Sequence, residues 1–142
     1  MELQLLGPQD AGILAATEPG LFDNPVDPVQ ARAFLTAPLH HIIVARDGGQ
    51  IVAFASGTVL LHPDKPPALF INEVGTRESH RRRGFGAAVT QALIAHARGL
   101  GCKGIWLGTE TDNAAARALY RSLGGEELTI AGYGWDGAFD VG

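Results

Sequence analysis

Two patterns of apolar residues follow one another along this chain, one typical of strands and the other typical of helices. Runs rich in Ile and Val cover residues 41–46 and 50–61, and the turn Asp47-Gly48-Gly49 lies between them. This order is typical of a hairpin of two antiparallel strands. Another apolar run at residues 69–76, after several prolines, predicts the central strand of the same sheet.

Helical spacing predicts four helices. They cover residues 11–17, 29–36, 82–100 and the segment from residue 114 to 123. The buried stripe of the third is expected at Val89, Leu93, Ala97 and Leu100, and that of the fourth at Ala116, Leu119, Tyr120 and Leu123. Gly101 and Gly124 stand where glycine commonly ends a helix.

Further short strands are predicted at residues 3–6 and 105–109. The tail alternates well enough for two last strands, residues 126–131 and 133–139, joined near Gly132. The sequence therefore predicts one mixed α/β domain over residues 1–142, with six to seven strands and about four helices.

Composition narrows the class of protein. With 142 residues, 46% hydrophobic, 18% charged and no long apolar run, the chain is expected to be one soluble, cytoplasmic domain without a membrane anchor or leader. A net charge of −4 disfavours a nucleic-acid partner. The single Cys102 is expected to be an ordinary thiol, and the histidines form no recognised metal spacing, so no metal is expected.

A basic, glycine-rich segment follows the central strand and opens the third helix. Arg77 and His80 precede it, and its members are Arg81, Arg82, Arg83, Gly84, Phe85, Gly86 and Ala87. Arg77, His80 and the three arginines form a basic cluster, which predicts a local positive site on an acidic protein. Backbone N–H groups at a helix start have no intrahelical partner, and glycine lets phosphate oxygens approach them. Arginines add forked donors, so the segment predicts a pyrophosphate-binding loop.

A second motif sharpens this prediction. It runs from Thr111 through Asn113 and Tyr120 to Gly125, with small residues in its first turn. Together the two motifs resemble the GNAT superfamily of acyl-CoA-dependent N-acetyltransferases, whose first motif is matched at Arg81, Gly84 and Gly86. Gly125 departs from the family pattern, in which a bulky apolar residue is commoner. The layout also looks like the small aminoglycoside 3-N-acetyltransferase branch.

The resemblance implies a mostly antiparallel GNAT sheet whose middle strands splay to admit acetyl-CoA. An extended strand with a free edge can pair with the amides of the donor's arm, and Val74, Gly75 and Thr76 lie where that pairing is expected. Gly75 is expected to relax the strand into a bulge. The resemblance also implies donor contacts at Asn113 and Ala116.

Three side chains are candidate catalytic groups. The resemblance carries the general-acid role, protonation of the departing thiolate, onto Tyr120, although a tyrosine on an inward helix face is also a common core residue. Glu73, within an apolar strand, is the leading candidate base, and Glu110 could share or replace it. Structural ion pairing is the alternative for Glu73.

The expected reaction is direct transfer of an acetyl group from acetyl-CoA to a primary amine of a small molecule, aminoglycoside- or polyamine-like. Asp23 and Asp27 could add negative charge for such an acceptor, although both also suit turns and caps. A protein or peptide amine, or a non-catalytic acyl-CoA sensor on the same fold, are the alternatives. The family analogy implies a homodimer.

Overall fold

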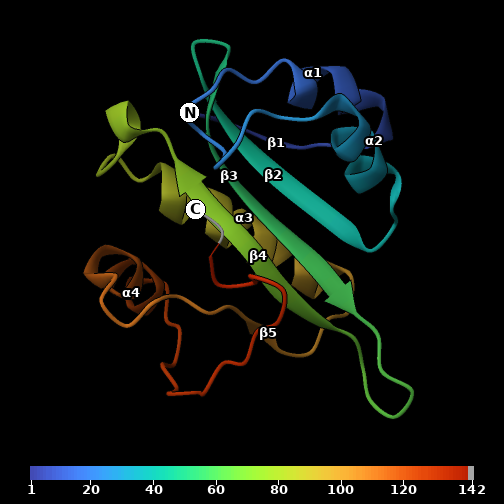
Figure 1. The fold of residues 1–142 in the computed structure, drawn as a ribbon, viewed down its shortest axis with the longest axis vertical. Helices are drawn as coiled ribbons and strands as arrows, with labels where there is room; N and C mark the ends of the chain where they lie inside the picture. The colour runs from blue at the N-terminus through green and yellow to red at the C-terminus, as the bar shows by residue number, and fades with distance from the viewer. Residues whose placement is uncertain (141–142) are drawn as a thin grey trace.

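The computed structural model describes residues 1–140, so the last two residues of the predicted domain lie outside it. Within that range the chain forms one five-stranded sheet in the order β1-β2-β3-β4-β5. The strands are β1 (Glu2–Leu5), β2 (His40–Asp47), β3 (Gln50–Leu60), β4 (Ala68–Thr76) and β5 (Ile105–Trp106). The first four pair antiparallel, and β5 runs parallel to β4 (Figure 1).

Helices cover both faces of this sheet (Figure 1). They are α1 (Ala11–Ala15), α2 (Pro28–Thr36), α3 (Phe85–Gly99) and α4 (Ala114–Ser122), with short 3-10 turns η1 (Pro8–Asp10) and η2 (Glu78–His80). Asp27 begins α2 by accepting a hydrogen bond from the Val29 N–H at 2.9 Å, and Pro28 occupies the first helical position. Asp27 is therefore a cap.

The sheet separates two apolar cores. Toward α3, the strand residues Ile43, Ala45 and Leu69 pack with Val89 and Leu93 of the helix. Toward α1 and α2, the alternate strand residues Ile42, Val44 and Phe54 pack with Leu14 and Leu35. The period of two along β2 thus places each half of its apolar residues in a different core.

A bulge in β4 lies just beyond the point where β4 and β5 part. Ser56 pairs with Glu73, whereas the next residue, Gly57, pairs with Ile71, so Asn72 is the extra residue. Beta4 pairs with β5 only at Leu69 and Phe70. The bulge follows directly, and the strands splay beyond it. The bulge predicted at Gly75 is therefore wrong, since Gly75 pairs regularly with Phe54.

Several other predictions are corrected within residues 1–140. The sheet has five strands because β5 ends at Trp106 and residues 126–139 form no strand. The large apolar side chains of that tail are exposed, as at Leu128 and Tyr133. Leu100 is 46% exposed, since α3 ends in a glycine turn in which the Cys102 N–H donates to the Ala97 carbonyl at 3.1 Å.

The same type of turn ends α4 and accounts for Gly125. Its N–H donates to the Tyr120 carbonyl at 3.0 Å, while Gly124 has φ +86°. A Cβ at position 125 would lie 2.9 Å from that carbonyl oxygen. Glycine is required there by the helix end, so its departure from the family pattern has a local structural reason.

Candidate active site

The predicted phosphate loop leads into α3. Gly84 is the N-cap residue of α3, with φ +85° and no side-chain capping bond, and Arg82 has φ +62°. Left-handed residues in a turn before a helix are typical of loops whose main-chain N–H groups bind an anion. Arg81, Arg82 and Arg83 are exposed beside it, whereas the Phe85 side chain is 5% exposed in the α3 core. Phe85 therefore anchors the loop from below.

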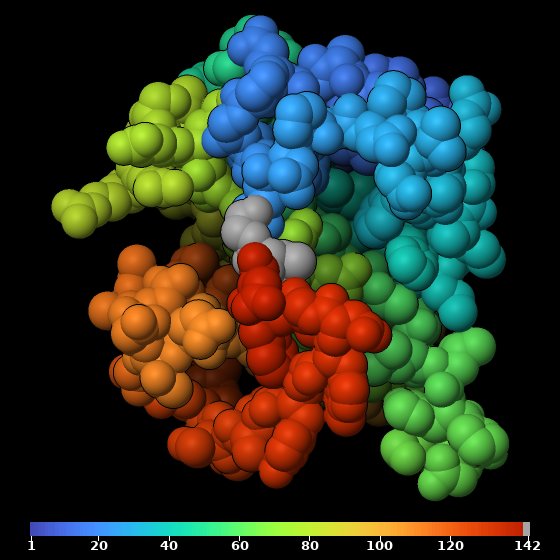
Figure 2. Space-filling model, viewed as in Figure 1, coloured from blue at the N-terminus to red at the C-terminus, as the bar shows by residue number. Residues whose placement is uncertain are grey.

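Gly86 lies where α3, β4 and α4 come close together, beside the gap between β4 and α4. A Cβ at this position would lie 3.3 Å from Thr76 Oγ1 of β4 and 3.6 Å from Leu119 Cδ2 of α4. A larger side chain would fill the space between the end of β4 and α4. Figure 2 shows a hollow between the yellow-green segment that follows β4 and the orange α4. The residues present therefore fit an extended phosphorylated ligand.

The C-terminal half of β4 borders this gap. Val74, Gly75 and Thr76 are half-buried and pair with β3 on one edge, while the ladder with β5 covers only two residue pairs further back. Their other edge faces the parted strands. Main-chain groups on such an edge can pair with the amides of an extended ligand.

Asn113 and Tyr120 both belong to α4, which borders the other side of the gap. Asn113 is the N-cap, and its Oδ1 accepts from the Ala116 N–H at 3.0 Å. Tyr120 is half-buried, and burial raises the pKa of its hydroxyl. A raised pKa keeps the phenol protonated at neutral pH, so that it can donate a proton or a hydrogen bond.

A pocket of about 180 Å³ lies where the loop between α1 and α2 meets β4. It is lined by Leu21, Phe22, Asp23, Phe54, Glu73, Val74 and Gly75. Glu73 is open to solvent, yet burial among its neighbours and the charge of Asp23 raise the pKa of its carboxyl. A carboxylate whose pKa is raised is a stronger base than an ordinary one, so Glu73 is better suited to accept a proton.

The other carboxylates do not join this pocket. Glu110 is exposed four residues beyond the end of β5, and its main-chain carbonyl accepts from the Asn113 N–H at 3.0 Å. Asp27 is occupied with capping α2. Of the four acidic residues considered from the sequence, the structure brings together only Asp23 and Glu73.

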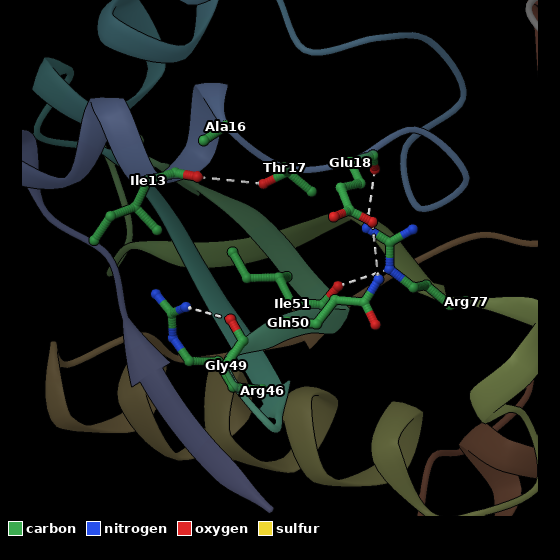
Figure 3. Close-up of a pocket in the computed structure, with 9 residues that line it drawn as sticks. All are labelled: Ile13, Ala16, Thr17, Glu18, Arg46, Gly49, Gln50, Ile51 and Arg77. Atoms are coloured by element: carbon green, nitrogen blue, oxygen red, sulfur yellow. Dashed lines mark hydrogen bonds between the residues drawn. The ribbon is translucent and has the colours of Figure 1, made fainter.

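Two residues of the basic cluster have other roles. Arg77 is only 8% exposed, and its guanidinium donates to the carbonyls of Glu18 and Ile51 (Figure 3) and to that of Pro19. His80 Nε2 lies 2.9 Å from Asp47 Oδ2. The prediction that Arg77 contributes to the positive site is wrong, because its neighbours in space belong to the α1–α2 loop.

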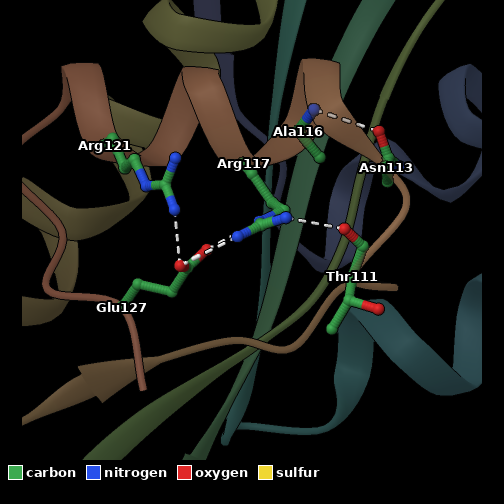
Figure 4. A network of polar contacts seen from close by, with 6 residues as sticks. All are labelled: Thr111, Asn113, Ala116, Arg117, Arg121 and Glu127. Atoms are coloured by element: carbon green, nitrogen blue, oxygen red, sulfur yellow. Dashed lines mark hydrogen bonds and ion pairs between the residues drawn. The ribbon is translucent and has the colours of Figure 1, made fainter. Parts of the chain in front are cut away.

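Sequence patterns also missed an ion-pair network behind α4. Arg117 contacts both carboxylate oxygens of Glu127, at 2.8 and 3.1 Å, and donates to the Thr111 carbonyl, while Arg121 contacts the same carboxylate (Figure 4). Hydrogen bonds from Arg117 and then Arg121 lower the pKa of Glu127 to about 2. The pairing joins the tail to α4, and the i, i+4 spacing of the two arginines was its available signal.

The parted strands, the glycine loop at the start of α3 and the carboxylate pocket all lie around the C-terminal half of β4. The family model described as Acetyltransferase (GNAT) family matches residues 13–124. The chain therefore belongs to this family, and it is an acyl-CoA-dependent N-acetyltransferase. The sequence prediction of family and fold is confirmed.

Individual relatives add detail. The N-alpha-acetyltransferase RimI of Mycobacterium tuberculosis is 35% identical over 123 residues, which cover 85% of this chain and 75% of that protein. A ribosomal protein alanine N-acetyltransferase of Escherichia coli is 37% identical over 82 residues, 58% of this chain and 52% of that protein. A solved aminoglycoside acetyltransferase from an uncultured soil metagenomic sample has TM-score 0.79 and 18% identity, covering 94% of this chain and 95% of that one.

The low identity to the aminoglycoside enzyme limits that likeness to the fold. Among residues 1–140, no helix is long and apolar enough to cross a membrane. Nor do the described residues gather three or more His, Cys, Asp or Glu side chains as a metal site.

Proposed function

We propose that this enzyme acetylates a primary amine of a small cationic molecule held in the Asp23–Glu73 pocket. The observation that carries the proposal is the position of this pocket, which is lined by Glu73, Val74 and Gly75 of β4. Val74 and Gly75 also lie on the strand edge that borders the gap between β4 and α4, which we call the donor gap. Two carboxylates at its mouth favour a cationic acceptor. An amine seated there lies next to the strand that aligns the donor.

The donor side is assigned to the residues of the two motifs. Main-chain N–H groups from Arg82 to Ala87 would hold the diphosphate, with Arg81 and Arg82 at the rim. The edge of residues 74–76 would pair with the donor's amides. Asn113 already uses its side-chain oxygen to cap α4, so donor contact is assigned to its amide nitrogen, beside Ala116.

Acetyl-CoA, when bound, supplies an activated acyl group on sulfur. Glu73 takes one proton from the acceptor ammonium, directly or through water, which frees the nitrogen lone pair. As the N–C bond forms and the C–S bond breaks, the Tyr120 hydroxyl protonates the sulfur. The second proton lost by nitrogen returns to the phenolate through water. The exposed position of Glu110 makes it the weaker candidate base.

Turnover of acetyl-CoA against an amine panel tests this proposal. The panel contains a polyamine, an aminoglycoside, a diamino acid and a peptide with a free N-terminus. Saturable acetylation of a small polycation supports the proposal. Binding of CoA without turnover of any amine would instead support a sensor and contradict it.

A second acceptor class is favoured by one observation, the 35% identity with an N-alpha-acetyltransferase across most of this chain. A peptide N-terminus would place its α-amine at Glu73 and its following residues across the α1–α2 loop. Preferential acetylation of the peptide in the same panel would select this class. The homodimer stays a prediction, which sedimentation of the purified chain would test.

A further inference from the structure

Arg77 is a buried cation held by three main-chain carbonyls. Its Nε donates to the Ile51 oxygen at 2.8 Å and its Nη2 to the Glu18 oxygen at 2.9 Å (Figure 3), and its Nη1 donates to the Pro19 oxygen at 2.9 Å. A charge that is only 8% exposed is costly unless it is well hydrogen-bonded. The planar guanidinium supplies donors in three directions at once, which a lysine ammonium on a flexible stem does not reproduce.

These carbonyls belong to two separate parts of the fold. Ile51 lies at the start of β3, and the Arg77 main-chain N–H donates to the neighbouring Val52 oxygen at 2.8 Å. Glu18 and Pro19 follow α1 and open the loop that leads to α2. The side chain therefore fastens the beginning of this loop to the sheet.

The fastened turn continues directly into the wall of the Asp23–Glu73 pocket. Gly20 has φ +105°, and a Cβ there would lie 3.4 Å from Arg77 Nη1. The chain then passes to Leu21, whose carbonyl lies 3.4 Å from the Cβ position of Gly75, and on to Asp23. Arg77 itself follows the last residue of β4, so one strand end carries both Glu73 and the fastening of the facing wall.

We propose that Arg77 is a positioning residue for the amine acceptor: by holding residues 18–20 it sets the distance of Asp23 from Glu73. This inference rests on the proposed function of the pocket. The hydrogen bonds of the Arg77 guanidinium go to the carbonyls of residues 18, 19 and 51, none of which is assigned to the donor side. Its loss should therefore weaken acceptor binding and leave donor binding unchanged.

Arg77→Lys tests the proposal, with Arg46→Lys as the matched control. Arg46 lines the same cavity of about 460 Å³ as Arg77. Its guanidinium bonds Gln4 and the Gly49 carbonyl and makes no bond to residues 18–23. For Arg77→Lys we expect the amine KM to rise about tenfold, with the acetyl-CoA KM within about twofold of the parent. Arg46→Lys should change neither.

Hydrogen exchange supplies a readout that does not depend on activity. Amides of residues 20–24 should exchange about tenfold faster in Arg77→Lys, while those of α3 keep the parent rate. Gly20→Ala, which strains the same turn without removing Arg77, should also raise the amine KM selectively. Gly20→Ala replaces Arg77→Lys as the test variant if Arg77→Lys does not fold.

Each outcome decides the proposal. Equal rises in both KM values, an unchanged amine KM, or faster exchange spread over β3 and α3 would overturn it. If the parent enzyme acetylates no amine, the proposed function fails on its own. In that case faster exchange confined to residues 20–24 still supports the positioning role, and unchanged exchange there refutes it.

Discussion

A single methyl group at Gly84 tests the phosphate loop. Gly84 has φ +85° at the start of α3, and a Cβ there would meet nothing within 4 Å. Gly84→Ala should therefore cause no steric clash. Its cost is the backbone strain of an L-residue in the left-handed region, roughly 1–2 kcal/mol. The reduced entropy of the unfolded chain offsets about 0.4–1 kcal/mol of this. A net loss of about 1 kcal/mol corresponds to a fall in Tm of about 2–4 °C.

The same substitution should weaken acetyl-CoA binding by about tenfold, because relaxing this turn misaligns N–H groups that would face the diphosphate. Thermal unfolding and titration calorimetry measure the two effects. Gly99→Ala is the matched control: it lies at the end of α3, its φ is not positive, and its Cβ position is also open. Alanine there should raise stability by about 0.5–1 kcal/mol and leave affinity unchanged. Parent-like affinity in Gly84→Ala would refute the reasoning.

Three further predictions concern titrating groups. Burial raises the pKa of the Glu73 carboxyl, so turnover by the parent enzyme should fall on the acid side with a midpoint above 4.5, the ordinary pKa of a glutamate. Glu73→Gln should lower kcat/KM by about 10²–10⁴-fold and should remove this acid-side fall. An unchanged pH–rate profile in the variant contradicts the assignment of Glu73 as base. Tyr120→Phe should lower kcat by about 10²-fold or more with CoA affinity intact, and full activity would remove Tyr120 as acid. The Glu127 carboxyl should titrate with a pKa of about 2 in an NMR pH titration. Its pairing therefore contributes stability that is full above pH 4.5 and is lost as the pH falls from 4.5 toward 2. A midpoint near 4.5 would show that the pairing with Arg117 is absent in solution.

Local periodicity predicted the elements whose burial is set by one face. Val89, Leu93 and Ala97 are fully buried, as the helical spacing over α3 requires, and the Gly-containing turn gave the hairpin of β2 and β3. The two motifs correctly predicted that the glycine loop leads into α3 and that α4 ends just before Gly124. These features depend on residues close in sequence, so pattern alone suffices.

The failures depend on contacts distant in sequence. Arg77 was grouped with its neighbours in the chain, but its guanidinium is fixed by carbonyls 26 to 59 residues away. The bulge at Asn72 lies opposite Ser56 and Gly57 of β3, and the Asn72 side chain bonds Thr58, so it depends on the partner strand and not on Gly75. The alternation of residues 126–139 suits a strand, yet alternation does not supply the neighbouring edge that a strand requires.

The central claim is that the loop before α3 and the free edge of β4 hold acetyl-CoA. Amide chemical-shift mapping during titration with CoA tests it most directly. We expect saturable shifts that are largest at residues 74–76 and 82–87, with little change around the Arg46–Arg77 cavity. Absence of saturable shifts, or shifts centred elsewhere on the molecule, would contradict the account.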